Sequence, residues 1–134
     1  LKKLGKEGVI GVIEIPAIEI KLPVLSKWSY SLLKISVCRF QGPGVNETGN
    51  LVIIGHNYKN GSHFGKLDKL EVGSQVLLTG GDGQQKTYQV YEIETVGSDA
   101  LSELEPYRGD CGLTLVTCTS RGSLRRVVRC EQQA

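Results

Sequence analysis

Short apolar runs rich in β-branched residues, separated by turn-forming residues, most constrain what this chain can fold into. The clearest are residues 51–54 and 113–118, nearly continuous apolar runs that are typical of strands buried on both faces. Glycine supplies 17 of the 134 residues and punctuates most of the runs. The pattern predicts an all-β protein, either a barrel or a sandwich with many turns.

We expect seven or eight strands in a single domain that spans residues 1–134. The expected strands cover residues 9–14, 18–24, 35–41, 51–54, 72–78, 86–96, 113–118 and 124–131. Pro16 interrupts the chain after the first expected strand, and Pro23 marks an edge or the end of the second expected strand. One short helix is expected at 26–34, with further helical turns at 63–70 and 100–104.

Composition narrows the function classes. The 16 Lys and Arg against 14 Asp and Glu leave a net charge of +2, which is too small to indicate a nucleic-acid partner. No uncharged apolar run approaches the ~18 residues of a membrane span. The sequence has no Met, so Leu1 is not a translation start. Any N-terminal signal or anchor segment would therefore be absent from this sequence, and its absence says nothing about location.

Two reactive residues stand at the ends of the buried runs. His56 follows the run at 51–54 in Gly55-His56-Asn57, and Cys118 ends the run at 113–118. Strand ends that lead into loops are where a rigid scaffold presents reactive groups. A cysteine nucleophile needs a neighbouring base or cation to become a thiolate, and histidine is the usual partner.

The last expected strand is rich in arginine. Alternation puts Arg125, Val127 and Arg129 on one face, with Arg126 and Val128 on the other. A guanidinium near a thiolate would stabilise it and could hold an oxyanion. The residue types alone also allow a non-enzymatic β-barrel binding module in which Cys118 is only packed in the core.

The residue patterns of these segments resemble those of the sortases, the cysteine transpeptidases of Gram-positive cell surfaces. LTLVTC at 113–118 is similar to their TLxTC-type strand end, and GNLVIIGHN at 49–57 to the strand that precedes their histidine. RRVVRCE at 125–131 resembles their closing strand, with Cys130 where glycine is usual. The resemblance extends from about residue 8 to residue 131 and keeps the family's order of His, Cys and Arg.

The resemblance implies a closed sortase-type β-barrel and a role for each motif residue. Cys118 resembles the nucleophile, His56 the general acid and base, and Arg125 the residue that steadies the substrate oxyanion. Thr117 and Asn57 would lie beside the substrate. Two other residues compete for the role of the catalytic arginine: Arg126, which is one residue away from Arg125, and Arg129, which shares the face of Arg125.

The implied reaction is transpeptidation of an LPxTG-like sorting signal through a thioacyl intermediate. A second amine, from a peptidoglycan cross-bridge or a pilin lysine, then resolves the intermediate. The chemistry needs no cofactor. The implied location is the outer face of the cytoplasmic membrane of a Gram-positive bacterium, with the protein anchored through the segment absent here. The outline indicates a housekeeping or class D-like enzyme.

Several alternatives stay open at this point. A cysteine peptidase that only hydrolyses would share the site. An L,D-transpeptidase is disfavoured, because its His and Cys lie close together in the chain, unlike His56 and Cys118 here. His63 is expected to be structural or solvated.

Neither a metal nor a disulfide is assigned. Calcium needs several converging oxygens, and the acidic residues of the loops form no dense cluster that would supply them. These residues are Glu47, Asp68, Asp99, Glu103 and Glu105. Any pairing among Cys38, Cys111 and Cys130 is undetermined by the sequence.

Overall fold

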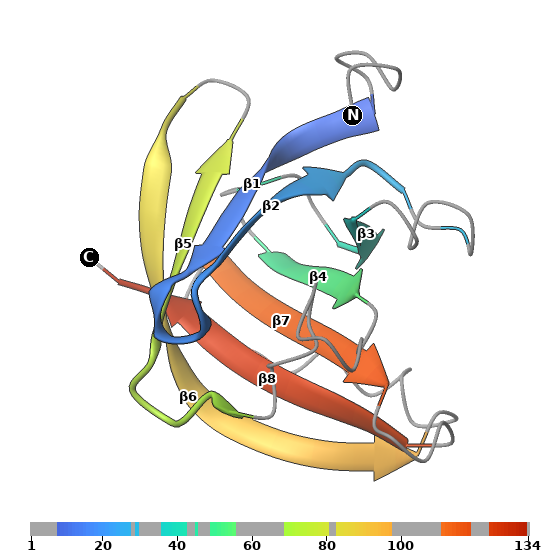
Figure 1. Ribbon diagram of the computed structural model, residues 1–134, viewed down its shortest axis with the longest axis vertical. Helices are drawn as coiled ribbons and strands as arrows, with labels where there is room; N and C mark the ends of the chain where they lie inside the picture. Colours follow the sequence, from blue (N-terminus) through green and yellow to red (C-terminus); the bar gives the residue numbers. More distant parts are fainter. Residues whose placement is uncertain are drawn as a thin grey trace.

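A computed structural model describes residues 8–27, 29, 36–42, 45, 49–55, 69–80, 83–97, 111–118 and 124–133. In this part of the chain, eight strands close one β-barrel in the order β1-β2-β3-β4-β7-β8-β6-β5 (Figure 1). The strands are β1 (Val9–Ile15), β2 (Ile20–Leu25), β3 (Val37–Gln41), β4 (Gly49–Gly55), β5 (Gln75–Gly80), β6 (Gln85–Gly97), β7 (Cys111–Cys118) and β8 (Leu124–Gln132). The all-β prediction is confirmed, and so is the closed barrel that the resemblance implies; closure excludes the sandwich that the residue pattern alone allowed. No helix among these residues has the length and apolarity to span a membrane.

The second strand begins later than the sequence pattern predicts. Ile18, its expected first residue, belongs to a 3-10 turn, η2 (Pro16–Ile18), and β2 starts at Ile20. Pro16 favours this turn because its fixed φ suits the first helical position and it has no N–H to leave unpaired. Glu19 closes the turn at a φ of 55°, which explains why alternation misplaces the boundary.

The fifth strand also begins later than expected, at Gln75 rather than Val72. Gly73 takes a φ of 100°, and the Ser74 N–H donates to the Glu71 carbonyl over 3.0 Å, so a turn replaces the first residues of the expected strand. The helical segments expected at 26–34, 63–70 and 100–104 lie mostly or wholly outside the described residues.

Pro23 lies within β2 at a point where the strand has a ladder partner on one side. It pairs with Val12 of β1, whereas the described ladder between β2 and β3 includes only Val24 and Leu25 of β2. The missing N–H of proline therefore breaks no hydrogen bond toward β3. On the side where Pro23 has no ladder partner, the Ser36 hydroxyl donates a hydrogen bond of 2.6 Å to the Pro23 carbonyl. Pro23 thus has a ladder partner on one side only, as a residue of an edge strand would, although the barrel is closed.

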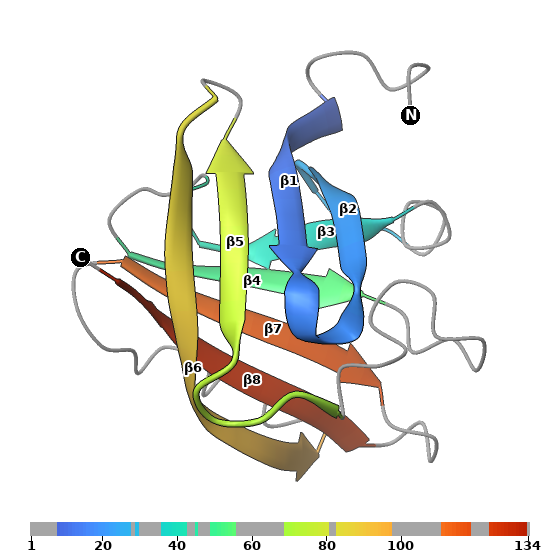
Figure 2. The ribbon, with the colours of Figure 1, turned by 60° about the vertical axis from the view of Figure 1, so that its left-hand side comes forward.

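The pairing of β4 with β7 is parallel and joins segments that are far apart in the chain. Parallel strands have their carboxyl ends at the same edge, so β4 and β7 end side by side. Strand β8 runs antiparallel to β7 and begins where β7 ends. Figure 2 shows β4, β7 and β8 as neighbouring strands crossing the lower half of the barrel.

Two separate apolar clusters mark the two faces of this part of the barrel wall. The interior holds a large cluster that includes Ile53 of β4, Leu115 of β7 and Val128 of β8. A smaller cluster consists of their sequence neighbours Val52, Val116 and Val127, with Phe40 and Ile54 packed against it. Successive strand residues point to opposite faces. The smaller cluster therefore lies on the outer face of β4, β7 and β8.

A β-bulge reverses the alternation of β6. The ladder with β8 shifts between Val90 and Glu92, so one extra residue stands opposite Cys130. Val90 packs in the interior before the bulge, and Ile93 packs against the interior cluster after it. The bulge thereby turns Glu92 and Glu94 to the outer face.

Cys38 and Cys130 are free, buried thiols, so a disulfide between them does not form. Burial raises the pKa of Cys38 to about 11, although a backbone hydrogen bond from Ser29 acts in the opposite direction. Burial in the barrel interior also raises the pKa of Cys130. Both thiols are therefore protonated at neutral pH. For Cys111 the description covers only its place in β7, opposite Gly49.

Candidate active site

The ends of β4 and β7 carry the residues that sequence analysis singles out. Their parallel ladder ends at the pair Gly55 and Thr117. His56 follows Gly55 in the chain, and Cys118 follows Thr117 as the last residue of β7. The structure thus brings together two chain segments that lead directly into the expected histidine and cysteine. His56 itself is outside the described residues.

Cys118 and Arg125 are direct cross-strand partners on the antiparallel strands β7 and β8. This register is a property of the backbone, and the side chains of both residues lie outside the described part of the structure. The next pair is Thr117 with Arg126. The two candidate arginines therefore occupy different register positions, and only Arg125 stands opposite the cysteine.

The register also places this pair on a face. Position 118 lies two residues after Val116, and position 125 lies two residues before Val127. Val116 and Val127 are themselves partners and belong to the outer apolar cluster. Since strand residues alternate with a period of two, Cys118 and Arg125 belong to this same outer face.

Thr117 connects the two strand ends through its side chain. Its hydroxyl donates a hydrogen bond of 2.7 Å to the carbonyl oxygen of Gly55, and the residue is 2% exposed. The bond thus joins the residue before Cys118 to the residue before His56. Because the Thr117 hydroxyl proton is already engaged, this geometry favours a role in spacing the strand ends.

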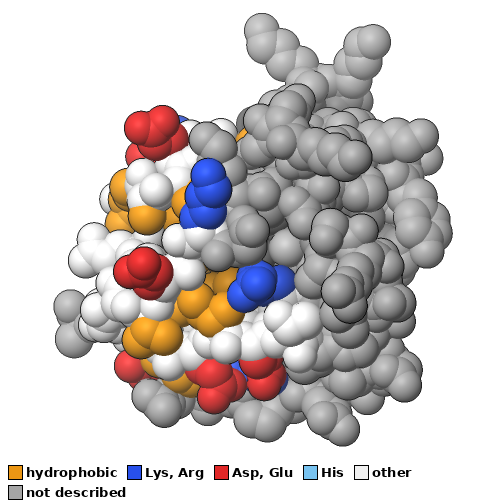
Figure 3. All heavy atoms as spheres, turned by 60° about the horizontal axis from the view of Figure 1, so that its bottom comes forward, with side chains coloured by type: hydrophobic (Ala, Val, Ile, Leu, Met, Phe, Trp, Pro, Cys, Tyr) orange, Lys and Arg blue, Asp and Glu red, His pale blue; other side chains and the backbone are white. Residues whose placement is uncertain are grey.

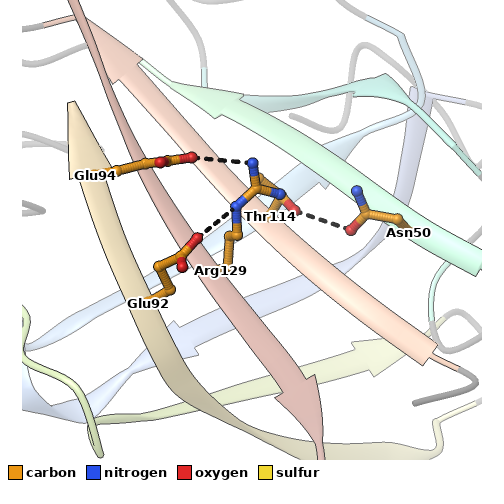
Figure 4. A network of polar contacts seen from close by, with 5 residues as sticks. All are labelled: Asn50, Glu92, Glu94, Thr114 and Arg129. Carbon is orange, nitrogen blue, oxygen red and sulfur yellow. Dashed lines mark hydrogen bonds and ion pairs between the residues drawn. The ribbon is translucent and has the colours of Figure 1, made fainter. Parts of the chain in front are cut away.

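A polar row crosses the outer face farther from these strand ends (Figure 4). The Thr114 hydroxyl donates to the side-chain carbonyl of Asn50 over 2.9 Å. Arg129, the cross-strand partner of Thr114, forms ion pairs with two carboxylates of β6. Its Nε lies 3.1 Å from Oε1 of Glu92, and one terminal nitrogen, Nη2, lies 3.0 Å from Oε1 of Glu94.

The two partners of each ion pair differ in how exposed their side chains are. The Arg129 side chain is 9% exposed, whereas those of Glu92 and Glu94 are 52% and 39% exposed. The buried guanidinium is thus anchored, and the carboxylates reach it from the surface. Figure 3 brings the bottom of Figure 1 forward, and on the described part of that face acidic, basic and apolar side chains are interspersed.

The outer face consequently has three tiers along β4, β7 and β8. The polar row stands at one end, the apolar cluster in the middle, and the Cys118–Arg125 pair at the far end. Sequence analysis identifies the third tier but misses Glu92, Glu94 and their pairing with Arg129. Simple alternation from Val90 directs both acids into the barrel, and two charges inside an apolar core were the available signal that β6 contains a bulge.

The other residues that the sequence analysis considers, of which only Asn57 was an expected site residue, lie outside the described part of the chain. They are Asn57, His63 and the loop acids Glu47, Asp68, Asp99, Glu103 and Glu105. The residues that the structure does describe contain no group of three or more His, Cys, Asp or Glu that could hold a metal ion.

Comparison with known proteins bears on the whole chain. A family model described as "Sortase domain" matches residues 13–133. Sortase A of Streptococcus agalactiae serotype III (strain NEM316) is 28% identical over 132 residues, which cover 90% of this chain and 51% of that protein. The chain thus spans about half the length of this relative.

Solved structures with the same fold have similar descriptions. Sortase C1 of Streptococcus agalactiae superposes with a TM-score of 0.84 at 33% identity, covering 98% of this chain and 70% of that one. A sortase C of Streptococcus pneumoniae, described in terms of catalysis and pilin substrate specificity, gives a TM-score of 0.85 at 29% identity. It covers 99% of this chain and 70% of that one.

Proposed function

This chain belongs to the sortase family, and from that membership we propose that it is a cysteine transpeptidase with Cys118 as its nucleophile. The observation that carries the proposal is the direct pairing of Cys118 with Arg125 at the edge where β4 leads into His56. An ordinary cysteine, with a pKa of ~8.5, is mostly a neutral thiol at pH 7. A neighbouring base or cation favours the thiolate, and the proposed site supplies both, in His56 and Arg125.

The first half-reaction forms a thioester. The Cys118 thiolate attacks a backbone carbonyl carbon, usually that of the Thr–Gly bond in an LPxTG-like sorting signal. Arg125 stabilises the oxyanion that develops on the carbonyl oxygen. The intermediate collapses with cleavage of the C–N bond, and the His56 imidazolium gives its proton to the departing amine.

The second half-reaction forms a new amide. An amine from a peptidoglycan cross-bridge or a pilin lysine attacks the thioester, and His56 accepts its proton. The Cys118 thiolate leaves, so enzyme and charge return to their starting state. One amide bond replaces another, and no ATP, metal or redox cofactor enters the balance.

The same membership supports the partners and the location that we propose. We place the enzyme at the cell surface of a Gram-positive bacterium, anchored through a segment outside this sequence and acting on secreted proteins that carry a sorting signal. The similarity to a sortase C described for its pilin substrate specificity supports a protein or pilin substrate. Residues 1–134 would be the catalytic domain.

Intact-protein mass spectrometry tests the proposal. The protein is incubated with an LPxTG-type peptide, with and without triglycine. We expect an acyl adduct on Cys118 equal in mass to the N-terminal peptide fragment, and its release as a triglycine amide. The Cys118→Ala variant is the control and should show neither product. Cleavage without capture by triglycine would indicate a peptidase. No adduct across several signal variants, together with a Cys118 inert to alkylation, would favour a non-enzymatic barrel.

A further inference from the structure

We propose that Arg129 is a positioning residue that holds the Glu94 carboxylate away from Arg125, so that the Arg125 guanidinium stays available to the substrate. The inference rests on the proposed role of Arg125 as the oxyanion-binding residue. It assigns a task to the ion-pair cluster of Arg129, Glu92 and Glu94, which the transpeptidation mechanism does not use.

The register places Glu94 between two arginines. Glu94 stands directly opposite Val127 on β8, and the bulge in β6 puts it on the outer face. On that face the two diagonal neighbours of Glu94 are positions 125 and 129. Diagonal cross-strand positions are within reach of long side chains. Glu94 could therefore pair with either arginine, and the structure shows it bound to Arg129 over 3.0 Å.

Glu92 lacks this ambiguity. It is the direct cross-strand partner of Arg129, two residues farther from position 125 than Glu94 is. Arg129 binds it through Nε over 3.1 Å and Glu94 through Nη2, so a single planar guanidinium holds both carboxylates. Two negative charges share this one cation. Loss of Arg129 would leave both without a partner at this position, and only Glu94 lies diagonal to Arg125.

Substitution of Arg129 tests the inference by rescue. We expect Arg129→Gln to slow thioacyl formation about five- to tenfold, because Glu94 then competes for the Arg125 guanidinium. Adding Glu94→Gln should return the rate to within about twofold of the wild type. Glu94→Gln alone should leave the rate nearly unchanged, because Glu94 is already paired with Arg129 in the wild type.

The matched control is the double variant Arg129→Gln/Glu92→Gln. It has the same net charge as Arg129→Gln/Glu94→Gln but retains Glu94, so we expect it to stay slow. Equal rescue by both doubles would mean that only overall charge matters and would overturn the inference. No rescue by either would reduce Arg129 to a structural residue and overturn it as well.

Folding is followed by thermal unfolding of every variant. Should Arg129→Gln not fold, Arg129→Lys replaces it, since an ammonium keeps the charge but lacks the planar fork that holds two carboxylates. A smaller loss, again reversed only by Glu94→Gln, is then expected. The Arg125→Gln variant distinguishes a failure of the proposed role of Arg125 from a failure of the proposed role of Arg129. If that variant reacts at the wild-type rate, the proposed role of Arg125 fails and this inference with it. If it is inactive and the rescue pattern is absent, this inference alone fails.

Discussion

The Thr117 hydroxyl donates a 2.7 Å hydrogen bond to the carbonyl oxygen of Gly55 and so ties together the last paired residues of β7 and β4. Each of these residues directly precedes a proposed catalytic residue, Cys118 or His56. The separation between nucleophile and base therefore depends on one buried side-chain contact in addition to the backbone ladder.

Replacement of Thr117 tests this contact. Thr117→Val keeps the shape but removes the donor and leaves a buried carbonyl acceptor without it, which costs ~1–3 kcal/mol. We expect a lower melting temperature and slower thioacyl formation, whereas Thr117→Ser should retain most of both. A Thr117→Val variant with unchanged stability but a raised KM would instead place the hydroxyl against the substrate.

The nucleophile assignment predicts that Cys118→Ala loses all turnover and keeps its fold. The change removes the reacting sulfur at the end of β7, and a strand end tolerates loss of one atom. Circular dichroism and the peptide-capture reaction provide the two measurements. Cys38→Ala is the matched control, because its buried, free thiol has no part in the mechanism, and it should remain active. Turnover by Cys118→Ala would exclude the assignment.

The register of β8 predicts opposite outcomes for two adjacent arginines. Arg125 stands opposite Cys118, whereas Arg126 stands opposite Thr117. We expect Arg125→Gln to lower the rate of thioacyl formation by 10²-fold or more, the scale known for loss of one oxyanion-stabilising donor. Arg126→Gln should stay within a few-fold of the wild type. The reverse result would show that the catalytic position is one residue farther along the strand.

The buried thiols predict a loss of stability at alkaline pH. The pKa of Cys38 is raised from 9.0 to about 11 by burial. Below pH 9 the thiol is neutral in both folded and unfolded chains, so its contribution does not change. Between pH 9 and 11 the unfolded chain ionises first, and the free energy of unfolding falls by at most ~1.4 kcal/mol per pH unit for this group.

Urea unfolding at pH 8 and pH 10 measures this slope. Tyrosine and lysine also titrate in this range, so the comparison is between the wild type and Cys38→Ala. The variant should lose less stability over the interval. Identical pH dependence in the two proteins would mean that the Cys38 thiol does not ionise preferentially in the unfolded chain.

Local pattern was sufficient for most of the strands. The apolar runs at 51–54 and 113–118 lie within β4 and β7, and Pro16 does separate β1 from β2. These features depend on contacts between residues close in the chain, where side-chain period and backbone preference act directly. The boundaries at Ile18 and Val72 failed, because turns at Pro16–Ile18 and around Gly73 take apolar residues that alternation assigns to strands.

The ion pairs of Arg129 with Glu92 and Glu94 on the outer face could not be predicted from local sequence pattern. Alternation counted from Val90 puts Glu92 and Glu94 inside the barrel, and only the bulge opposite Cys130 reverses this. A bulge is favoured by the ladder as a whole, because it spares two carboxylates from burial and lets Ile93 pack on the core instead. It therefore depends on where β8 lies, which no local window contains.

The sequence by itself determined that this chain forms short buried strands with a histidine after one and a cysteine at the end of another, because strand period and apolar content are local properties. The residue pattern left both a barrel and a sandwich open, although the family resemblance implied a barrel. Only the tertiary structure decided between them from the chain itself, and it decided that β4 and β7 pair in parallel and that Arg125 stands opposite Cys118. Closure and the β4–β7 pairing join residues distant in sequence, whereas Arg125 and Cys118 are close in the chain and depend on the register between β7 and β8. These relationships form because closing the sheet buries one shared interior, and the energy of that burial is available only when all eight strands are in place.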